Sequence, residues 1–219
     1  MPRKRPVNSP DSAHRAPTPD QVVAAILGVI ERDGWDAVTL DRMARACGVK
    51  SLKNLHTPDD LFSFVVSWVD DRMAAVTSSS EESPVTQEGI SDDSAGVKDR
   101  LFDLFMARFD ALQVHRAGFV RLIHDMSRSV FAKGEVCAAR GRLIPLFAAM
   151  DRVLTQAGIP GEGLARKFKI FSIFVLYLVI LKVWIKDTSP DLSTTMAALD
   201  RRLDQWIGIS GWVSEGGGP

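Results

Sequence analysis

Residues 39–61 read TLDRMARACGVKSLKNLHTPDDL, and this stretch decides the fold. Four of its residues share one helix face because they fall at i, i+3, i+4 and i+7: Leu40, Met43, Ala44 and Cys47. Thr39 comes just before this run, where its hydroxyl suits an N-cap. Gly48 follows the run, and glycine tolerates the positive φ found where helices end. The stretch therefore predicts a short helix and a tight turn, as in the first half of a helix-turn-helix.

The segment upstream of this stretch predicts another helix. Residues 18–21 (TPDQ) have the pattern of a capping box with proline in the first turn. An apolar stripe follows over residues 22–30, and Gly34 ends the run. The N-terminal part is thus expected to pack as a small group of helices. An arbitrary pair of packed helices would carry the same turn pattern and is the alternative.

The order of these features resembles the TetR family of helical transcriptional regulators. That family has an apolar helix, the pattern G-[WY]-x-A-x-[ST], a short helix and turn, and then a recognition helix. The matching positions in this chain are Gly34, Trp35, Ala37, Thr39, Met43, Ala44, Gly48 and Val49. The resemblance covers residues 21–73 and implies an all-α, TetR-like fold. An N-terminal helix-turn-helix head would precede a C-terminal helical bundle for ligand binding and dimerisation.

The resemblance also implies a function, a transcriptional repressor that is gated by a largely apolar small ligand. Its head would bind double-stranded DNA, with lysines on phosphates and an asparagine at an adenine edge. The residues expected to contact DNA are Thr39, Arg42, Lys50, Ser51, Lys53, Asn54 and His56.

The segment that should contain the recognition helix departs from the family pattern. Residues 48–61 are fewer than that pattern uses, and Asp59 and Asp60 follow Pro58 where the family places a lysine. Carboxylates at a helix N-terminus repel a phosphate. Residues 20–73 hold nine acids and six bases, which gives a net charge of −3. DNA binding depends on cations near phosphates, so this charge is unfavourable.

A second interpretation takes these departures as the main signal. The lipid-binding accessory proteins of coenzyme Q biosynthesis share the TetR fold, and as a group they are not DNA readers. They carry a similar S-P-D stretch before a late helix, which here would be residues 189–191. The alternative function is therefore a TetR-fold protein that has lost DNA binding and acts as a lipid-binding accessory protein.

Composition and motifs exclude several other classes. The 219 residues have no net charge and are 46% hydrophobic, which suits a protein with a core better than one that coats nucleic acid. Cys47 and Cys137 are far apart, which indicates a reducing cytoplasm, and no signal peptide is recognisable. The histidines lack one-turn metal spacing, and no nucleophile or phosphate-loop motif occurs. We therefore expect no enzyme activity, metal or cofactor.

Composition also divides the chain into five parts. Residues 1–17 form a basic tail that is expected to be disordered, and residues 18–76 form the helix-turn-helix domain. Residues 77–96 carry five acids and no base, so they should form a flexible linker. The ligand-binding and dimerisation domain spans residues 97–210, and residues 211–219 form a disordered tail.

Apolar stripes predict five helices in the C-terminal part. The longest, over residues 164–186, has an apolar centre shorter than the about 20 residues of a membrane span. We therefore expect a central buried helix and no membrane insertion. Residues facing a ligand pocket between the helices would be Phe105, Phe109, His115, Phe119, Ile123, Met126, Phe171, Phe174 and Tyr177. Ordinary core packing is the alternative for each of them.

The last two expected helices, residues 164–186 and 192–207, carry the predicted subunit interface. Two such helices from each of two chains can form a four-helix contact in a homodimer. The residues expected there are Ile180, Trp184, Met196, Leu199, Leu203 and Trp206. Packing of these residues within one chain is the alternative.

Overall fold

A computed structural model of the chain describes residues 16–79, 94–132 and 136–215. Within these ranges the protein is all-α and contains no strand, which confirms the expected fold class at that level. The elements are α1 (Pro19–Asp33), a short 3-10 helix η1 (Trp35–Ala37), α2 (Leu40–Ala46), α3 (Pro58–Ser79), α4 (Ser94–Gln113), α5 (Arg116–Ala132), α6 (Val136–Gln156), α7 (Gly163–Lys186) and α8 (Ser193–Glu215).

The helix ends in the N-terminal part lie where the sequence predicts them. α1 begins with the expected capping box, in which the Thr18 hydroxyl accepts from the backbone of Gln21 and the Gln21 side chain accepts from the backbone of Thr18. Thr39 caps α2 by accepting from the backbone N–H of Arg42 at 3.4 Å. α1 stops at Gly34, whose φ of 83° is readily adopted only by glycine.

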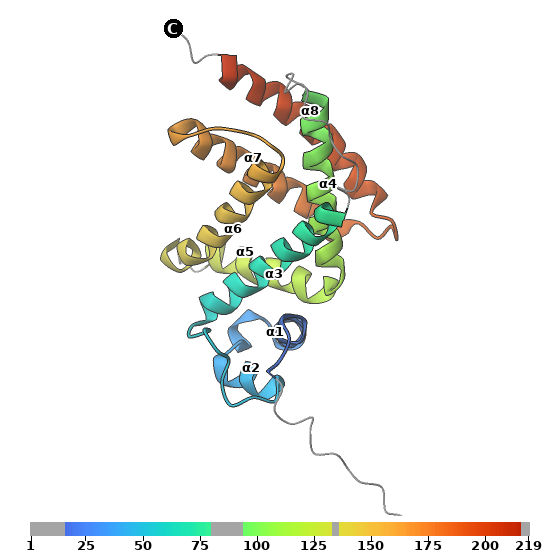
Figure 1. Cartoon of the computed structure of the whole chain (residues 1–219). Helices are drawn as coiled ribbons and strands as arrows, with labels where there is room; N and C mark the ends of the chain where they lie inside the picture. The colour runs from blue at the N-terminus through green and yellow to red at the C-terminus, as the bar shows by residue number, and fades with distance from the viewer. Residues whose placement is uncertain (1–15, 80–93, 133–135, 216–219) are drawn as a thin grey trace, which may run out of the picture.

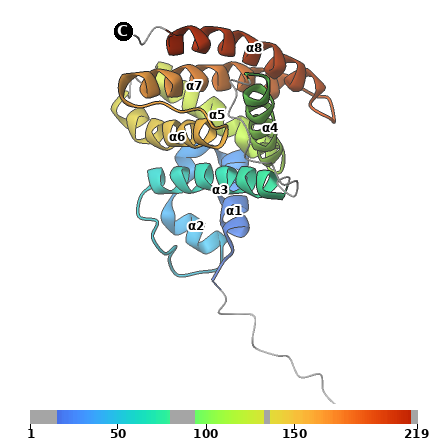
Figure 2. The same cartoon turned by 45° about the horizontal axis from the view of Figure 1, so that its top comes forward.

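The helices are arranged in layers along one direction. α1 and α2 lie at one end of the molecule and α8 lies at the other (Figure 1). α3 forms the layer next to α1 and α2, and α4, α6 and α7 lie between α3 and α8 (Figure 2). α3 packs against α1, α4 and α6, while α1 packs directly against α5. The buried apolar residues of these helices form one continuous core from α1 to α8.

A glycine allows the close approach of α5 to α1. A Cβ atom on Gly118 would lie 2.8 Å from both the carbonyl oxygen and the Cβ of Leu27, closer than real side chains allow. Beside this contact, the backbone N–H of Trp35 donates to Asp125 of α5 at 2.9 Å. The guanidinium of Arg142, on α6, lies 5.3 Å from the centre of the Trp35 ring. The N-terminal helices are therefore fastened directly to the helical body.

α7 is buried on one side only, which corrects the expectation of a central buried helix. By length and composition α7 could cross a membrane, and 39% of its most apolar window is buried inside the chain. It packs against α6 and α8, an arrangement consistent with a soluble protein. The core-facing residues are Ile173, Phe174, Leu176, Tyr177, Ile180, Leu181 and Trp184.

Several predicted boundaries shift. α3 extends to Ser79 and α4 begins at Ser94, so both ends of the expected linker are helical, while its centre lies outside the described residues. α8 continues to Glu215, beyond the predicted end of the last helix. Nearly all of the expected basic tail lies outside the described residues.

Candidate functional site

The segment expected to read DNA does not form a helix. α2 ends at Ala46 and α3 begins at Pro58, and residues 47–57 between them form turns, bends and irregular backbone. Asn54 lies in the left-handed region with a φ of 63°, a conformation that interrupts a right-handed helix. The Leu52 side chain is buried and anchors the loop to the core. The expectation of a recognition helix after the turn is therefore wrong.

The expected DNA contacts do not share a helix face. Five of them are exposed on the loop: Lys50, Ser51, Lys53, Asn54 and His56. The other two lie at α2, where Thr39 is the N-cap that precedes the helix and Arg42 is in its first turn. Arg42 forms an ion pair with Asp33, so its charge is already partly neutralised. These residues lie at one end of the molecule, but no single helix presents them together to DNA.

Asp60 occupies the N-terminus of α3, next to the loop. Its Oδ2 atom accepts from the backbone N–H groups of His56 and Thr57, each at 2.8 Å. These backbone hydrogen bonds, together with one from the Thr57 side chain, lower the pKa of Asp60. A phosphate would need to displace a carboxylate that already satisfies those donors. This helix end is therefore not an anion site.

The aromatic residues expected around a pocket are packed against one another. The Tyr177 ring lies 6.0 Å from the ring of Phe105 and 5.8 Å from that of Phe109. The centre of the Phe174 ring lies 4.8 Å from the centre of the Phe147 ring. Phe105 and Phe109 are completely buried, in the manner of a filled core. Core packing, the alternative interpretation, describes these residues.

The other residues of the expected pocket lie apart from one another. His115 lies at the start of α5, 5.9 Å from Trp68, and burial is the main reason that its pKa is lowered. Phe119 is buried, whereas Ile123 and Met126 are half-buried further along α5. Phe171 points outward from α7. The structure does not bring the expected ligand residues into one site.

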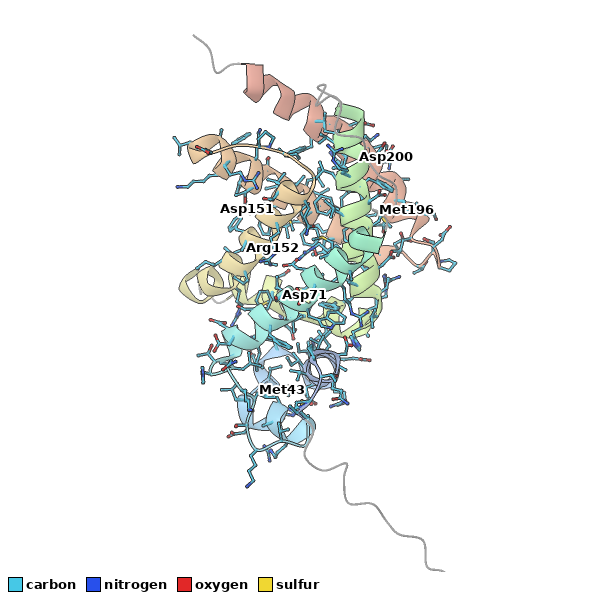
Figure 3. The ribbon with its side chains drawn as sticks, in the orientation of Figure 1. Met43, Asp71, Asp151, Arg152, Met196 and Asp200 are labelled. Carbon is cyan, nitrogen blue, oxygen red and sulfur yellow. The ribbon has the colours of Figure 1, made fainter. Side chains whose placement is uncertain are left out.

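A partly buried ion cluster, which sequence reasoning missed, joins three helices. Asp70 of α3 pairs with Arg108 of α4 and with Arg152 of α6. Figure 3 shows Arg152 between α6 and α3. The Arg108 guanidinium lies 5.5 Å from the centre of the Tyr177 ring. Since Asp70 is 38 and 82 residues from its partners along the chain, helical periodicity offers no signal that pairs them.

The expected subunit-interface set needs a correction. Ile180, Trp184, Leu199 and Leu203 are completely buried within one chain. Trp206 is nearly so, and its Nε1 atom donates to the Ser172 hydroxyl across α7 and α8 at 2.9 Å. Of the six expected residues, Met196 alone is exposed. Buried side chains offer no area to a second chain, so these residues pack within the monomer.

A different set of α7 residues faces outward. We call this set the α7 stripe: Leu164, Phe168, Phe171, Val175 and Leu178, whose exposed fractions are 84%, 49%, 55%, 43% and 39%. The five residues recur in alternating steps of four and three residues. That spacing keeps them on one helix face and is typical of helices that pack against another helix. The sequence hid this face, because residues 170–181 of α7 are almost all apolar and show no amphipathic contrast.

A groove of about 370 Å³ runs between α7 and α8 beside the α7 stripe. Its walls are mostly apolar, and its charged residues are Lys169 and Arg202. The remaining lining residues are Phe168, Phe171, Ser172, Val175, Leu176, Val179, Gln205 and Trp206. The groove therefore combines an apolar channel with positive charge, an arrangement suited to an amphiphile.

No protein-family model and no curated protein sequence matches this chain. Its function is therefore inferred from the geometry of the loop, the α7 stripe and the α7–α8 groove.

Proposed function

We propose that this chain is a homodimeric, TetR-like cytoplasmic protein that has lost DNA reading and serves as an accessory protein for an apolar, lipid-like ligand. The observation that carries this proposal is the non-helical segment between Ala46 and Pro58. Helix-turn-helix proteins place the second helix of the motif in the major groove, and its N-terminal residues contact the bases. A loop without that helix has no element that could enter the major groove of DNA.

Charge supports the loss of DNA reading. Residues 20–73 have a net charge of −3, and two carboxylates, Asp59 and Asp60, stand at the start of α3. Non-specific affinity for DNA comes almost entirely from cations on phosphates. The N-terminal part therefore lacks the net positive charge that a DNA-reading domain needs.

The α7 stripe supports the homodimer. Contiguous exposed apolar side chains on a soluble protein mark an interaction site. A helix face with alternating steps of four and three residues fits another helix, and the same face on a second copy supplies one. The dimer proposed here therefore uses the outward face of α7, in place of the buried residues that the sequence favoured.

A second candidate is the regulator implied by the family resemblance. It is favoured by the exposure of Lys50, Lys53 and Asn54 on one loop. In that case the loop would contact the DNA backbone directly, with phosphates bound by the two lysines. The ligand would then act by changing the separation of the two loops in the dimer.

A salt titration separates the two functions. Fluorescence anisotropy of a labelled random duplex is measured between about 50 and 200 mM salt for the wild type and a Lys50→Ala/Lys53→Ala variant. The accessory protein predicts weak binding that the two substitutions leave unchanged. Tight binding that falls steeply with salt and is weakened by the substitutions would establish the regulator instead. A Lys167→Ala variant, changed on α7 far along the chain, is the matched control.

A further inference from the structure

We propose that the groove between α7 and α8 binds the carboxylate form of a single long-chain fatty acid. This inference rests on the proposed function as a binding protein and gives the ligand a chemical class and a place. The place differs from the one that the sequence suggested, because the bundle centre is filled by Phe105, Phe109 and Tyr177.

The shape and lining of the groove suit an alkyl chain. Its volume of about 370 Å³ falls within the range of small-molecule sites, roughly 300–1,000 Å³. Phe168, Phe171, Val175 and Val179 line the α7 side and remain at least one-third exposed in the single chain. Covering these side chains with a methylene chain removes apolar surface from water on both partners.

The floor of the groove is closed by a satisfied polar pair. Trp206 donates its Nε1 hydrogen to the hydroxyl of Ser172, at 2.9 Å. Since both groups are already paired, an alkyl chain that lies over them leaves neither group without a partner. The floor therefore tolerates an apolar ligand.

The charge of the groove selects an anion. Lys169 and Arg202 line it, and the lining includes no carboxylate. The Lys169 ammonium donates to the carbonyl of Pro160 at 3.1 Å, and Arg202 donates to the Gln205 amide oxygen at 2.9 Å. Both of these partners are neutral, so the two positive charges stay available to a ligand carboxylate.

The surrounding helix reinforces this preference. α7 carries five bases between residues 163 and 186 and no acid. Arg166 is offset by Asp151, whose carboxylate lies 2.6 Å from its Nε. Lys169, the α7 base that lines the groove, has no such acidic partner on its own helix, so its charge attracts an anion and repels a cationic amphiphile.

The proposed dimer would enclose the ligand. Phe168, Phe171 and Val175 belong both to the α7 stripe and to the groove, whereas Leu164 and Leu178 belong to the stripe alone. A second copy seated on the stripe would therefore cover the open side of the groove. One acid per chain, or two per dimer, is the expected stoichiometry.

Calorimetry and native mass spectrometry of the full chain test the site. Hexadecanoate, below its aggregation concentration, is compared with methyl hexadecanoate, which has the same chain and no charge. Hexadecanoate should bind at one molecule per chain and more tightly than the ester. Arg202→Gln or Lys169→Gln should weaken binding of the acid by about tenfold, the effect of one lost charge-assisted bond, and leave the ester unchanged. Arg201→Gln and Lys167→Gln remove a neighbouring charge on each helix and should change neither.

Several outcomes would overturn the proposal. Equal binding of acid and ester, no binding of either, or full affinity in Arg202→Gln and Lys169→Gln would each do so. Binding to phosphatidylglycerol vesicles without binding of the monomeric acid would make the α7 stripe a membrane contact instead.

Light scattering on the same samples separates the proposed dimer from the proposed fatty-acid groove. A monomer that binds the acid refutes the dimer alone, and a dimer that ignores the acid refutes the groove alone. Circular dichroism confirms that each variant is folded.

Discussion

Asp70 on α3 and Arg108 on α4 form an ion pair in the interior of the protein, where their exposed fractions are 4% and 2%. Arg152 of α6 pairs with the second carboxylate oxygen of Asp70. The Arg108 Nε atom is buried and has no hydrogen-bond partner among the described residues. One carboxylate therefore pairs with two guanidinium groups and connects three helices.

Replacing Asp70 by asparagine should strongly destabilise the fold. The Arg108 charge would remain in a low-dielectric interior without its counter-charge, a change that typically costs about 3–5 kcal/mol. Urea unfolding at a fixed protein concentration measures the loss.

Two variants control for this effect. Asp71→Asn changes the neighbouring exposed residue, which Figure 3 also labels, and should alter the free energy of unfolding by no more than about 0.5 kcal/mol. Arg152→Gln removes the partner whose side chain is 48% exposed, and should cost about 1 kcal/mol or less. A loss for Asp70→Asn as small as that for Asp71→Asn would contradict the role of the cluster.

Gly118→Ala should weaken the joint between α5 and α1. The added methyl group would lie 2.8 Å from the backbone and side chain of Leu27, so the two helices must separate. Overpacking of this kind costs about 1–3 kcal/mol of stability.

Gly28→Ala, on α1, is the matched control because its Cβ would meet only the end of Arg32, at 3.6 Å. That variant should be stabilising by up to about 1 kcal/mol, since alanine favours helix. Thermal unfolding of both variants measures these changes in stability. Equal changes for Gly118→Ala and Gly28→Ala would contradict the close contact between α5 and α1.

Local signals in the sequence predicted the helix ends. The capping box at Thr18, the N-cap at Thr39 and the glycine stop at Gly34 depend on residues within one turn of each other. Such short-range chemistry is readable without knowing the rest of the fold. The core stripes of α4 and α5 were recognisable for the same reason, because helical spacing places their apolar residues on one face.

Long-range contacts were not predictable in this way. The partners of Asp70 lie on two other helices, and no spacing rule connects them. The outward face of α7 was also missed, since an apolar run without polar breaks does not indicate which side meets the core. The groove beside it needs both α7 and α8 in place, and Arg202 alone gives no hint of it. Residues 48–61 are fewer than the family pattern uses, but only the structure shows that residues 47–57 contain no helix.

Asp187 organises the turn between α7 and α8. Its carboxylate accepts from the hydroxyl and the backbone N–H of Ser189 and, at 2.7 Å each, from the backbone N–H and the hydroxyl of Thr195. Burial alone would raise the pKa of Asp187, but these hydrogen bonds outweigh it and hold that pKa far below its usual value. The turn also holds the buried Leu192 at a φ of 56°, a strained conformation for a branched residue.

The low pKa of Asp187 predicts a specific dependence of stability on pH. A carboxyl whose pKa is lower in the folded state stabilises the fold above its unfolded pKa of about 3.9, and this stabilisation is lost as the pH falls towards the folded pKa. Asp187→Asn should therefore lower the free energy of unfolding by about 1–3 kcal/mol near neutral pH. The difference in this free energy between the variant and the wild type should narrow below about pH 4. Chemical unfolding across this pH range gives this difference directly.

A conservative pair at Thr195 provides the control for this prediction. Thr195→Ser keeps the hydroxyl that donates to Asp187, whereas Thr195→Val keeps the shape and removes that donor. The serine variant should follow the wild-type pH profile, and the valine variant should lose part of the stabilisation above pH 4. A gap between wild type and Asp187→Asn that stays constant down to about pH 2 would show that the carboxylate is not what stabilises the turn.

The proposed dimer should tighten as salt is added. Lys167, Lys182 and Lys186 are exposed on the helix that carries the α7 stripe, and α7 has no acid to balance them. Bringing two such helices together places like charges near each other, and salt screens that repulsion.

Leu178→Gln, which changes the stripe but not the groove, should weaken dimerisation by about tenfold through the loss of about 1.4 kcal/mol of apolar burial. Ile144→Gln replaces an exposed apolar residue of α6, outside the stripe, and should have no effect. Sedimentation equilibrium in low and high salt measures these constants. A dimer that dissociates on adding salt, or that is equally affected by both substitutions, would place the subunit contact elsewhere than on α7.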